Sequence, residues 1–105
     1  MRAIFFTTTV TTAGTRVQLL NTLDDVKWLQ LKARAANTGR IFIGLDDVSA
    51  TVNGWELSIP LTGRPNDPLV LDFGKYKDGS VKMNLFYADS SDNGQIVDGV
   101  AIVQP

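Results

Sequence analysis

The 105-residue sequence contains no cysteine and no histidine. Without cysteine, the chain can form neither a disulfide framework nor a thiolate nucleophile. Without histidine, it can form neither a Ser-His-Asp triad nor a His-ligated zinc site, and it lacks the side chain that normally titrates near neutral pH. Both absences argue against an enzyme, and we expect neither a catalytic metal nor another cofactor.

The net charge is close to zero, and the chain has no long apolar run. Ten Lys and Arg residues nearly balance eleven Asp and Glu residues, which argues against a nucleic-acid partner and against a polybasic membrane-surface protein. The apolar patch near Met1 ends in Thr7–Thr9, short of the roughly 7–15 residues of a signal-peptide core. No run reaches the roughly 20 apolar residues of a membrane span. We therefore expect a soluble protein without a cleaved export signal and with no membrane partner.

Short stretches of alternating apolar and polar residues are what the chain does contain. Hydrophobic residues make up 44% and charged residues 20%, which is typical of one globular domain, expected over residues 1–105. Gly, Asn, Asp and Pro separate the stretches at roughly 8–12-residue intervals. This spacing predicts an all-β fold of about eight short strands, either an antiparallel β-sandwich or a small barrel, and we take the sandwich. The expected strands are 4–12, 15–20, 26–35, 39–45, 55–59, 69–73, 81–87 and 95–104.

Residues 26–35 are the one segment where a helix competes with a strand. Asp24 or Asp25 would cap a helix, and the segment is rich in helix-forming residues. However, Leu29 and Leu31 would lie about 200° apart on a helix, so their alternation favours a strand. Asn37-Thr38-Gly39 then predicts a tight turn, because Asn and Gly tolerate positive φ. We expect segments 26–35 and 39–45 to form a hairpin.

Most carboxylates lie in predicted turns. Ten of the eleven are Asp, which favours turns because its side chain bonds nearby backbone amides. Paired carboxylates acting in a glycosidase are the alternative, but their sequence spacing does not indicate a shared cleft. Asp89-x-x-Asp92-x-Gly94 partly matches a calcium loop, yet it lacks the full ligand spacing and the late Glu. A plain loop over 89–94 is favoured, like the loops predicted at 61–68 and 76–79.

The two tryptophans have different predicted environments. Trp28 falls on the face of Val26, Gln30 and Lys32, opposite the leucines assigned to the core. An indole there is either a contact residue or a buried side chain, and both interpretations stay open. For Trp55 the alternation favours the core. Either tryptophan, together with a tyrosine, could alternatively form a sugar-stacking platform of a carbohydrate-binding module.

The chain has more apolar side chains than the core-facing side of a sandwich sheet would bury. Phe5, Phe6, Phe42 and Phe86 add to the apolar side chains already assigned to the core face. Because large exposed apolar patches are rare in monomers, this excess favours a protein that works in an assembly. Arg40 belongs to a small basic group with Lys32 and Arg34, for which an ordinary solvated strand face is the favoured explanation. The contact candidates are Trp28, Arg40, Phe42, Phe5 and Phe6, with residues 1–9 as a possible extended arm that adds a strand to a neighbour.

A series of turn and strand motifs runs through residues 8–59. It begins with Thr11-Thr12-Ala13-Gly14-Thr15 and Val17-x-Leu19. It continues with Asn37-Thr38-Gly39, Ile41-x-Ile43-Gly44, Asp47-Val48-Ser49 and Asn53-Gly54-x-x-Leu57. These motifs resemble a recurrent pattern in small virion proteins of tailed bacteriophages.

The resemblance implies a jelly-roll-like β-sandwich that acts as a capsid decoration or cement protein. Its expected partners are the major capsid protein and itself, as a homotrimer or another small homo-oligomer. Its expected location is the capsid surface of a virion, after synthesis in the host cytoplasm. No catalytic residue transfers, because the pattern contains no catalytic motif. A tail, neck or fibre accessory component and a carbohydrate-binding module are the alternatives.

Overall fold

The structure, a computed structural model, describes residues 2–34, 37–49, 54–57, 68–73 and 81–104. The predicted turn at 76–79, nearly all of the loop 61–68 and the end of the strand 55–59 lie outside these residues. Within them, the chain forms nine strands and one short 3-10 helix. All strand pairs are antiparallel, and the strands form two sheets, which confirms the predicted all-β sandwich.

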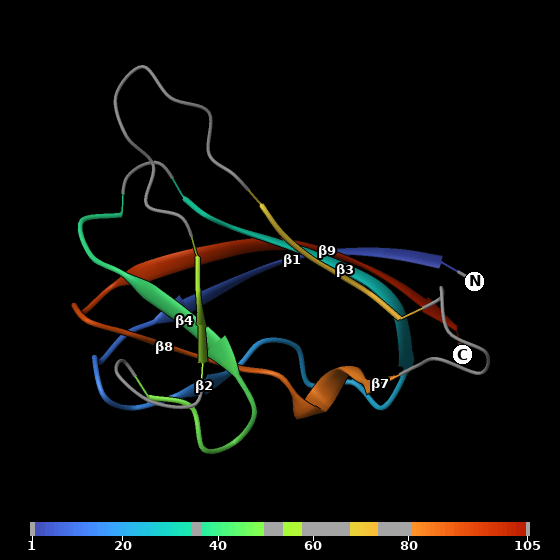
Figure 1. The fold of residues 1–105 in the computed structure, drawn as a ribbon, viewed down its shortest axis with the longest axis horizontal. Helices are drawn as coiled ribbons and strands as arrows, with labels where there is room; N and C mark the ends of the chain where they lie inside the picture. Colours follow the sequence, from blue (N-terminus) through green and yellow to red (C-terminus); the bar gives the residue numbers. More distant parts are fainter. Residues whose placement is uncertain (1, 35–36, 50–53, 58–67, 74–80, 105) are drawn as a thin grey trace.

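The larger sheet, sheet A, has the strand order β1-β9-β3-β6, and β7 also pairs with β3. Its strands are β1 (Arg2–Val10), β3 (Asp25–Ala33), β6 (Leu69–Asp72), β7 (Val81–Lys82) and β9 (Gln95–Gln104). Sheet B has the order β2-β8-β4-β5. Its strands are β2 (Val17–Gln18), β4 (Ile41–Gly44), β5 (Gly54–Glu56) and β8 (Tyr87–Ser90). Figure 1 shows the long strands β1, β3 and β9 as one layer and β2, β4 and β8 as the other.

The hydrophobic core lies between the two sheets. Sheet A contributes the leucines of β3 and alternate residues of β9, and sheet B contributes the isoleucines of β4. The fully buried core side chains include Leu29, Leu31, Ile41, Ile43 and Val97. Alternation of period two places these residues on one face of each strand, as the sequence predicts.

A register shift in β3 corrects the predicted face of Val26. Val26 pairs with Val103 and Trp28 pairs with Ile102, so Lys27 is an extra residue in the ladder with β9. Such a bulge exchanges the faces on its two sides. Val26 is therefore fully buried with the leucines, whereas Trp28 lies on the opposite face.

The predicted hairpin between 26–35 and 39–45 is wrong, because β3 and β4 belong to different sheets. Asn37 instead pairs with β9: its side-chain amide donates to the Ile96 carbonyl at 2.8 Å and accepts from the Ile96 N–H at 2.8 Å. Buried Gln95 accepts hydrogen bonds from the N–H groups of Thr38 and Gly39 at 2.9 and 2.8 Å. These two side chains fix the crossing from one sheet to the other.

The predicted strand 81–87 is also wrong as a single element. A 3-10 helix, η1 (Met83–Leu85), separates β7 in sheet A from β8 in sheet B. The interruption resets the alternation, so Phe86 joins the core at 4% exposure while Leu85 is 48% exposed. The predicted loop at 89–94 is shorter than expected, because Asp89 and Ser90 are buried residues of β8.

Residues 2–10 are an integral strand of sheet A. β1 pairs in regular register with β9 from Arg2 opposite Val103 to Val10 opposite Gln95. The possible extended arm at residues 1–9 is therefore corrected over 2–9, and Met1 lies outside the described residues.

Candidate interaction surface

The outer face of sheet A, meaning its side away from sheet B, consists of cross-strand rows. One row is Ala3, Ile102, Trp28 and Asp72, and the next is Phe5, Val100, Gln30 and Val70. Directly opposed residues in a sheet share a face, so each row runs across the sheet on the same side. A third row contains Thr7, Asp98 and Lys32. The face therefore has two mainly apolar rows bordered by a polar one.

Two apolar side chains of this face are strongly exposed. Phe5 is 82% exposed and Val70 is 45% exposed, at opposite edges of the same row. Trp28, Val100 and Ile102 between them are partly exposed. Isolated exposed apolar residues are ordinary, but several in adjoining rows are typical of an interaction surface.

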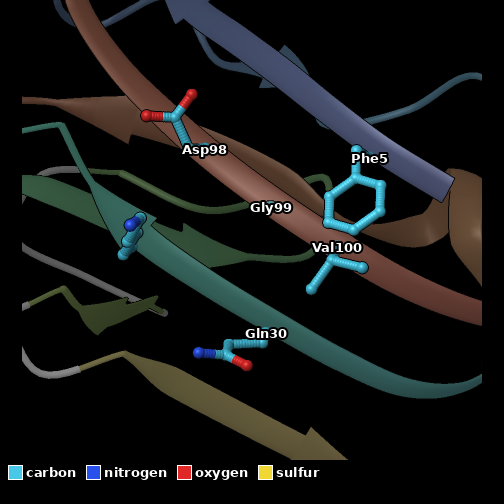
Figure 2. A pocket seen from close by; sticks show the side chains of 6 residues that line it. Phe5, Gln30, Asp98, Gly99 and Val100 are labelled. Atoms are coloured by element: carbon cyan, nitrogen blue, oxygen red, sulfur yellow. The ribbon is translucent and has the colours of Figure 1, made fainter. Parts of the chain in front are cut away.

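A hollow of about 280 Å³ lies on this face beside Phe5. Figure 2 shows the Phe5 ring on β1, Val100 and Asp98 on β9, and Gln30 on β3. Gly99 lines the hollow with its backbone, because a side chain at this position would point to the core and not to this face. The hollow has apolar walls from Phe5 and Val100 and polar walls from Lys32, Gln30 and Asp98, which suits a protruding side chain of a protein partner.

The polar border of the face is held by one carboxylate. Asp98 accepts hydrogen bonds from Arg34 Nη2 at 2.6 Å and Arg34 Nε at 3.0 Å, and from Thr7 Oγ1 at 3.0 Å. The Arg34 guanidinium, with a smaller contribution from Thr7, holds the pKa of Asp98 below its usual value, and partial burial opposes this shift. The border is thus a fixed, charge-paired row beside the apolar rows.

The structure brings only some of the predicted contact residues to this face. Phe5 and Trp28 lie on it, and Trp28 is partly exposed rather than part of the core. Phe6 instead points inward and packs against the core, so it is not part of this face, and its contact role stays a prediction. The strand alternation of β1 explains the difference, since successive side chains point to opposite faces.

Phe42 and Arg40 lie on sheet B and contact each other. The Arg40 guanidinium carbon lies 5.6 Å from the centroid of the Phe42 ring, and Phe42 is only 8% exposed. Arg40 donates to both carboxylate oxygens of Glu56, with Nη2 to Oε2 at 2.7 Å. These bonds lower the pKa of Glu56 and raise the pKa of Arg40. Phe42 is thus buried within its own chain, and it does not lie on the outer face of sheet A; its contact role stays a prediction.

Trp55 is exposed, as Phe5 is, and its predicted core position is wrong. It is 57% exposed on β5, opposite Ile43 of β4. Its ring borders a hollow lined by Gly44, Leu45, Asp47 and Gly54. The core is filled by Leu57, the next residue on that side of the strand, which leaves Trp55 at the margin of the sandwich.

Sequence reasoning missed Val70, Val100 and Ile102 as surface residues. A signal for two of them exists in residues 96–103, where apolar residues occupy both alternating positions. A strand with two apolar faces is typical of one covered on both sides. In this structure only one side of β9 faces the core, so the other apolar side is part of the candidate surface.

No metal or membrane feature competes with this surface in the described part of the chain. No three potential metal-ligating side chains lie together among residues 2–34, 37–49, 54–57, 68–73 and 81–104. The buried Asp89 carboxylate instead accepts hydrogen bonds from the N–H groups of Gly14 at 2.9 Å and Ser90 at 2.8 Å. The same residues include no helix with the length and apolar character needed to cross a membrane.

Comparison with protein-family models, with curated proteins and with solved structures finds no match to this chain.

Proposed function

We propose that this chain is a non-enzymatic structural protein of a tailed-phage virion, a decoration or cement subunit on the capsid surface. The observation that carries the proposal is the apolar outer face of sheet A, on which Phe5 and Val70 are strongly exposed. The resemblance of residues 8–59 to small virion proteins supports it. The partner of this face would be the major capsid protein.

The strand order supports the jelly-roll class for this fold. With β7 set aside, the two sheets have four strands each, and the chain crosses between the sheets at β1–β2, β2–β3 and β3–β4. Double-sheet jelly rolls of eight strands have connections of this kind. Jelly rolls occur in viral capsid domains among other proteins, so the fold is consistent with the proposed setting without specifying it.

The proposed mechanism is stabilisation by linkage. A protein that binds the assembled shell, and not its separated subunits, stabilises the shell against disassembly by an amount that grows with its free concentration relative to its Kd. The apolar rows would supply buried area, and the Asp98–Arg34 border would form the polar rim usual at interfaces. No step of this mechanism requires an acid, a base or a metal.

Co-sedimentation with emptied phage capsids tests the proposal. Wild-type protein should pellet with the particles, and Val70→Glu should weaken binding at least about tenfold, since a charge replaces an apolar contact at an interface. Leu45→Glu is the matched control: Leu45 is 49% exposed against 45% for Val70, but it follows β4 of sheet B. Wild-type protein that never pellets would refute the decoration role.

A tail, neck or fibre component could use the same surface on another partner. Immunogold labelling of intact particles distinguishes these locations directly. Gold on the head supports the capsid assignment, whereas gold confined to the tail or neck would replace it.

The exposure of Trp55 favours a second candidate function, a carbohydrate-binding module. Its indole is 57% exposed beside a hollow that includes Asp47, an arrangement in which a sugar ring could stack and hydrogen-bond. Glycan-array binding that disappears in Trp55→Ala, and persists in Val70→Glu, would support this function over the structural one. The two variants thus act as controls for each other.

A further inference from the structure

The free edge of β1 carries an ordered row of backbone groups, as the hydrogen-bond pattern of sheet A shows. The Arg34 N–H donates to the Ile96 carbonyl at 3.1 Å, continuing the register in which Ala33 lies opposite Val97. Hydrogen-bonded pairs alternate along an antiparallel ladder. Even-numbered residues of β9 therefore bond to β3, and its odd-numbered residues bond to β1.

The register between β1 and β9 then identifies the backbone groups at the free edge. Ile4 lies opposite Ala101, Phe6 opposite Gly99, and Thr8 opposite Val97. The even-numbered residues of β1 thus bond to β9. The odd-numbered residues, namely Ala3, Phe5, Thr7 and Thr9, direct their N–H and C=O groups away from the sheet. Within the described residues, β1 pairs with no strand other than β9.

This edge lacks the features that usually prevent strand addition. Natural edge strands are short, charged, bulged or interrupted by proline. β1 is nine residues long, its register is regular, and Arg2 at its first position is its only charged residue. The exposed Phe5 lies near its middle. Such an edge is complementary to another extended strand.

The C-terminal end of β1 contacts the chain's own residues beside β2. Thr8 Oγ1 donates to the Leu19 carbonyl at 2.7 Å, and Val10 is fully buried. The side chains of Ala3, Phe5 and Thr7 are all exposed. A pairing partner therefore has access to the segment from Ala3 to Thr7, and Phe5 is its midpoint.

We propose that two copies of this chain pair β1 with β1 in antiparallel orientation about a two-fold axis at Phe5. Phe5 then lies opposite the partner's Phe5, and Ala3 lies opposite the partner's Thr7. About six backbone hydrogen bonds form, because each of the three pairs exchanges two. The two A sheets become one continuous sheet, and the two outer faces become one surface.

A second copy fits this edge because the edge is self-complementary. A two-fold contact is isologous, so the same patch serves both subunits and the association closes at two. Antiparallel pairing brings the two Phe5 rings together and keeps the two Arg2 charges about 20 Å apart, given a rise of roughly 3.4 Å per residue. Parallel pairing would set the arginines side by side.

The proposed dimer does not rest on the proposed virion function, and it is measured without particles. In light scattering after size exclusion, wild-type protein should show twice the 11.4 kDa mass of one chain. Phe5→Lys should give monomer, since it places two like charges at the two-fold axis. Trp55→Lys, an exposed aromatic residue of sheet B, should remain dimeric. Unchanged far-UV circular dichroism and a cooperative melting transition would show that both variants fold, since loss of the dimer by itself lowers the melting temperature.

Single cysteines test the register, because the chain has none of its own. Opposed residues of a hydrogen-bonded pair have Cα atoms about 5.5 Å apart, within the range of a disulfide. Under oxidation Phe5→Cys should form a reducible dimer. Ala3→Cys alone should not, since its copies would lie about 14 Å apart along the strands. A mixture of Ala3→Cys and Thr7→Cys chains should cross-link.

The outcomes that overturn the proposal are specific. If wild-type protein is monomeric at every concentration measured by light scattering, the proposed dimer does not form. A dimer that survives Phe5→Lys uses another surface. A dimer in which Phe5→Cys fails to cross-link does not have its two-fold axis at Phe5. None of these results depends on whether the protein binds a capsid.

Discussion

Gly99 of β9 faces the ring of Phe6 on β1, with no space between them for a Cβ atom. An added Cβ would overlap Phe6 Cζ and lie 2.8 Å from Leu31 Cδ2. We predict that Gly99→Ala lowers the free energy of unfolding by about 1–3 kcal/mol, the usual cost of overpacking a core. Urea unfolding followed by tryptophan fluorescence measures this change.

The double variant with Phe6→Leu separates overpacking from a general effect of replacing glycine. In the Phe6→Leu background the ring is absent, so Gly99→Ala should cost less than in the wild type. Equal costs in both backgrounds would contradict the contact between Gly99 and Phe6.

The second prediction concerns Gln95, whose buried side-chain amide makes four hydrogen bonds. Its Oε1 accepts from the N–H groups of Thr38 and Gly39, and its Nε2 donates to Thr38 Oγ1 at 3.2 Å and to the Asn93 carbonyl at 3.0 Å. Gln95→Leu removes these bonds and leaves partly buried groups unpaired, which should cost about 2–3 kcal/mol. Thermal unfolding by calorimetry measures the loss.

Gln104→Leu on the same strand is the matched control, since Gln104 is exposed. It should change stability by less than about 0.5 kcal/mol. Similar losses in both variants would show that the amide of Gln95 has no special role.

The Gln95 and Asn37 contacts also show why the sequence predicted the strands β3 and β4 but not how they are connected. Asn37-Thr38-Gly39 has the composition of a hairpin turn, and local chemistry is all that a turn motif reports. The Asn37 amide instead pairs with Ile96, and Gln95 holds the next two residues, which lie 56 and 57 positions away in the sequence. Contacts at this separation decide which sheet β4 joins.

The candidate surface was predictable in part for a related reason. Alternation assigns residues to two faces of a strand, and it correctly placed Trp28 opposite the leucines. Alternation does not show whether the face turned away from the core is covered by another segment of the chain. Phe42 is covered because Arg40 lies over its ring and Val48 packs on the same side, near Gly54. Trp55 is exposed because it lies beyond the core at the margin of sheet B.

The third prediction concerns acid stability and depends on Asp98. Because Arg34 and Thr7 lower the pKa of Asp98 in the folded state, the unfolded state binds its proton more readily. The stabilisation by Asp98 is therefore fully present above its ordinary pKa of 3.8 and is lost as the pH falls through the lowered folded value. Asp98→Asn should be less stable than the wild type near neutral pH, and the difference should shrink on acidification.

Melting temperatures across an acid titration measure this difference. Arg34→Gln should reproduce the effect, since it removes the main cause of the lowered pKa. Lys32 also contributes to the field at Asp98, so Lys32→Gln should shift the profile by a smaller amount in the same direction. A gap between wild type and Asp98→Asn that stays constant at all pH values would contradict the assignment.

The fourth prediction concerns Thr8, whose hydroxyl joins the two sheets. Thr8 is 6% exposed, and its Oγ1 donates to the Leu19 carbonyl at 2.7 Å, next to β2 of sheet B. Thr8→Val keeps the shape of the side chain but leaves that carbonyl without this donor, which should cost about 1–2 kcal/mol. Thr9→Val is the matched control, because Thr9 is exposed on the opposite face of the same strand. Urea unfolding of the two variants should therefore differ, whereas equal midpoints would mean that the Thr8 hydroxyl contributes no net stability.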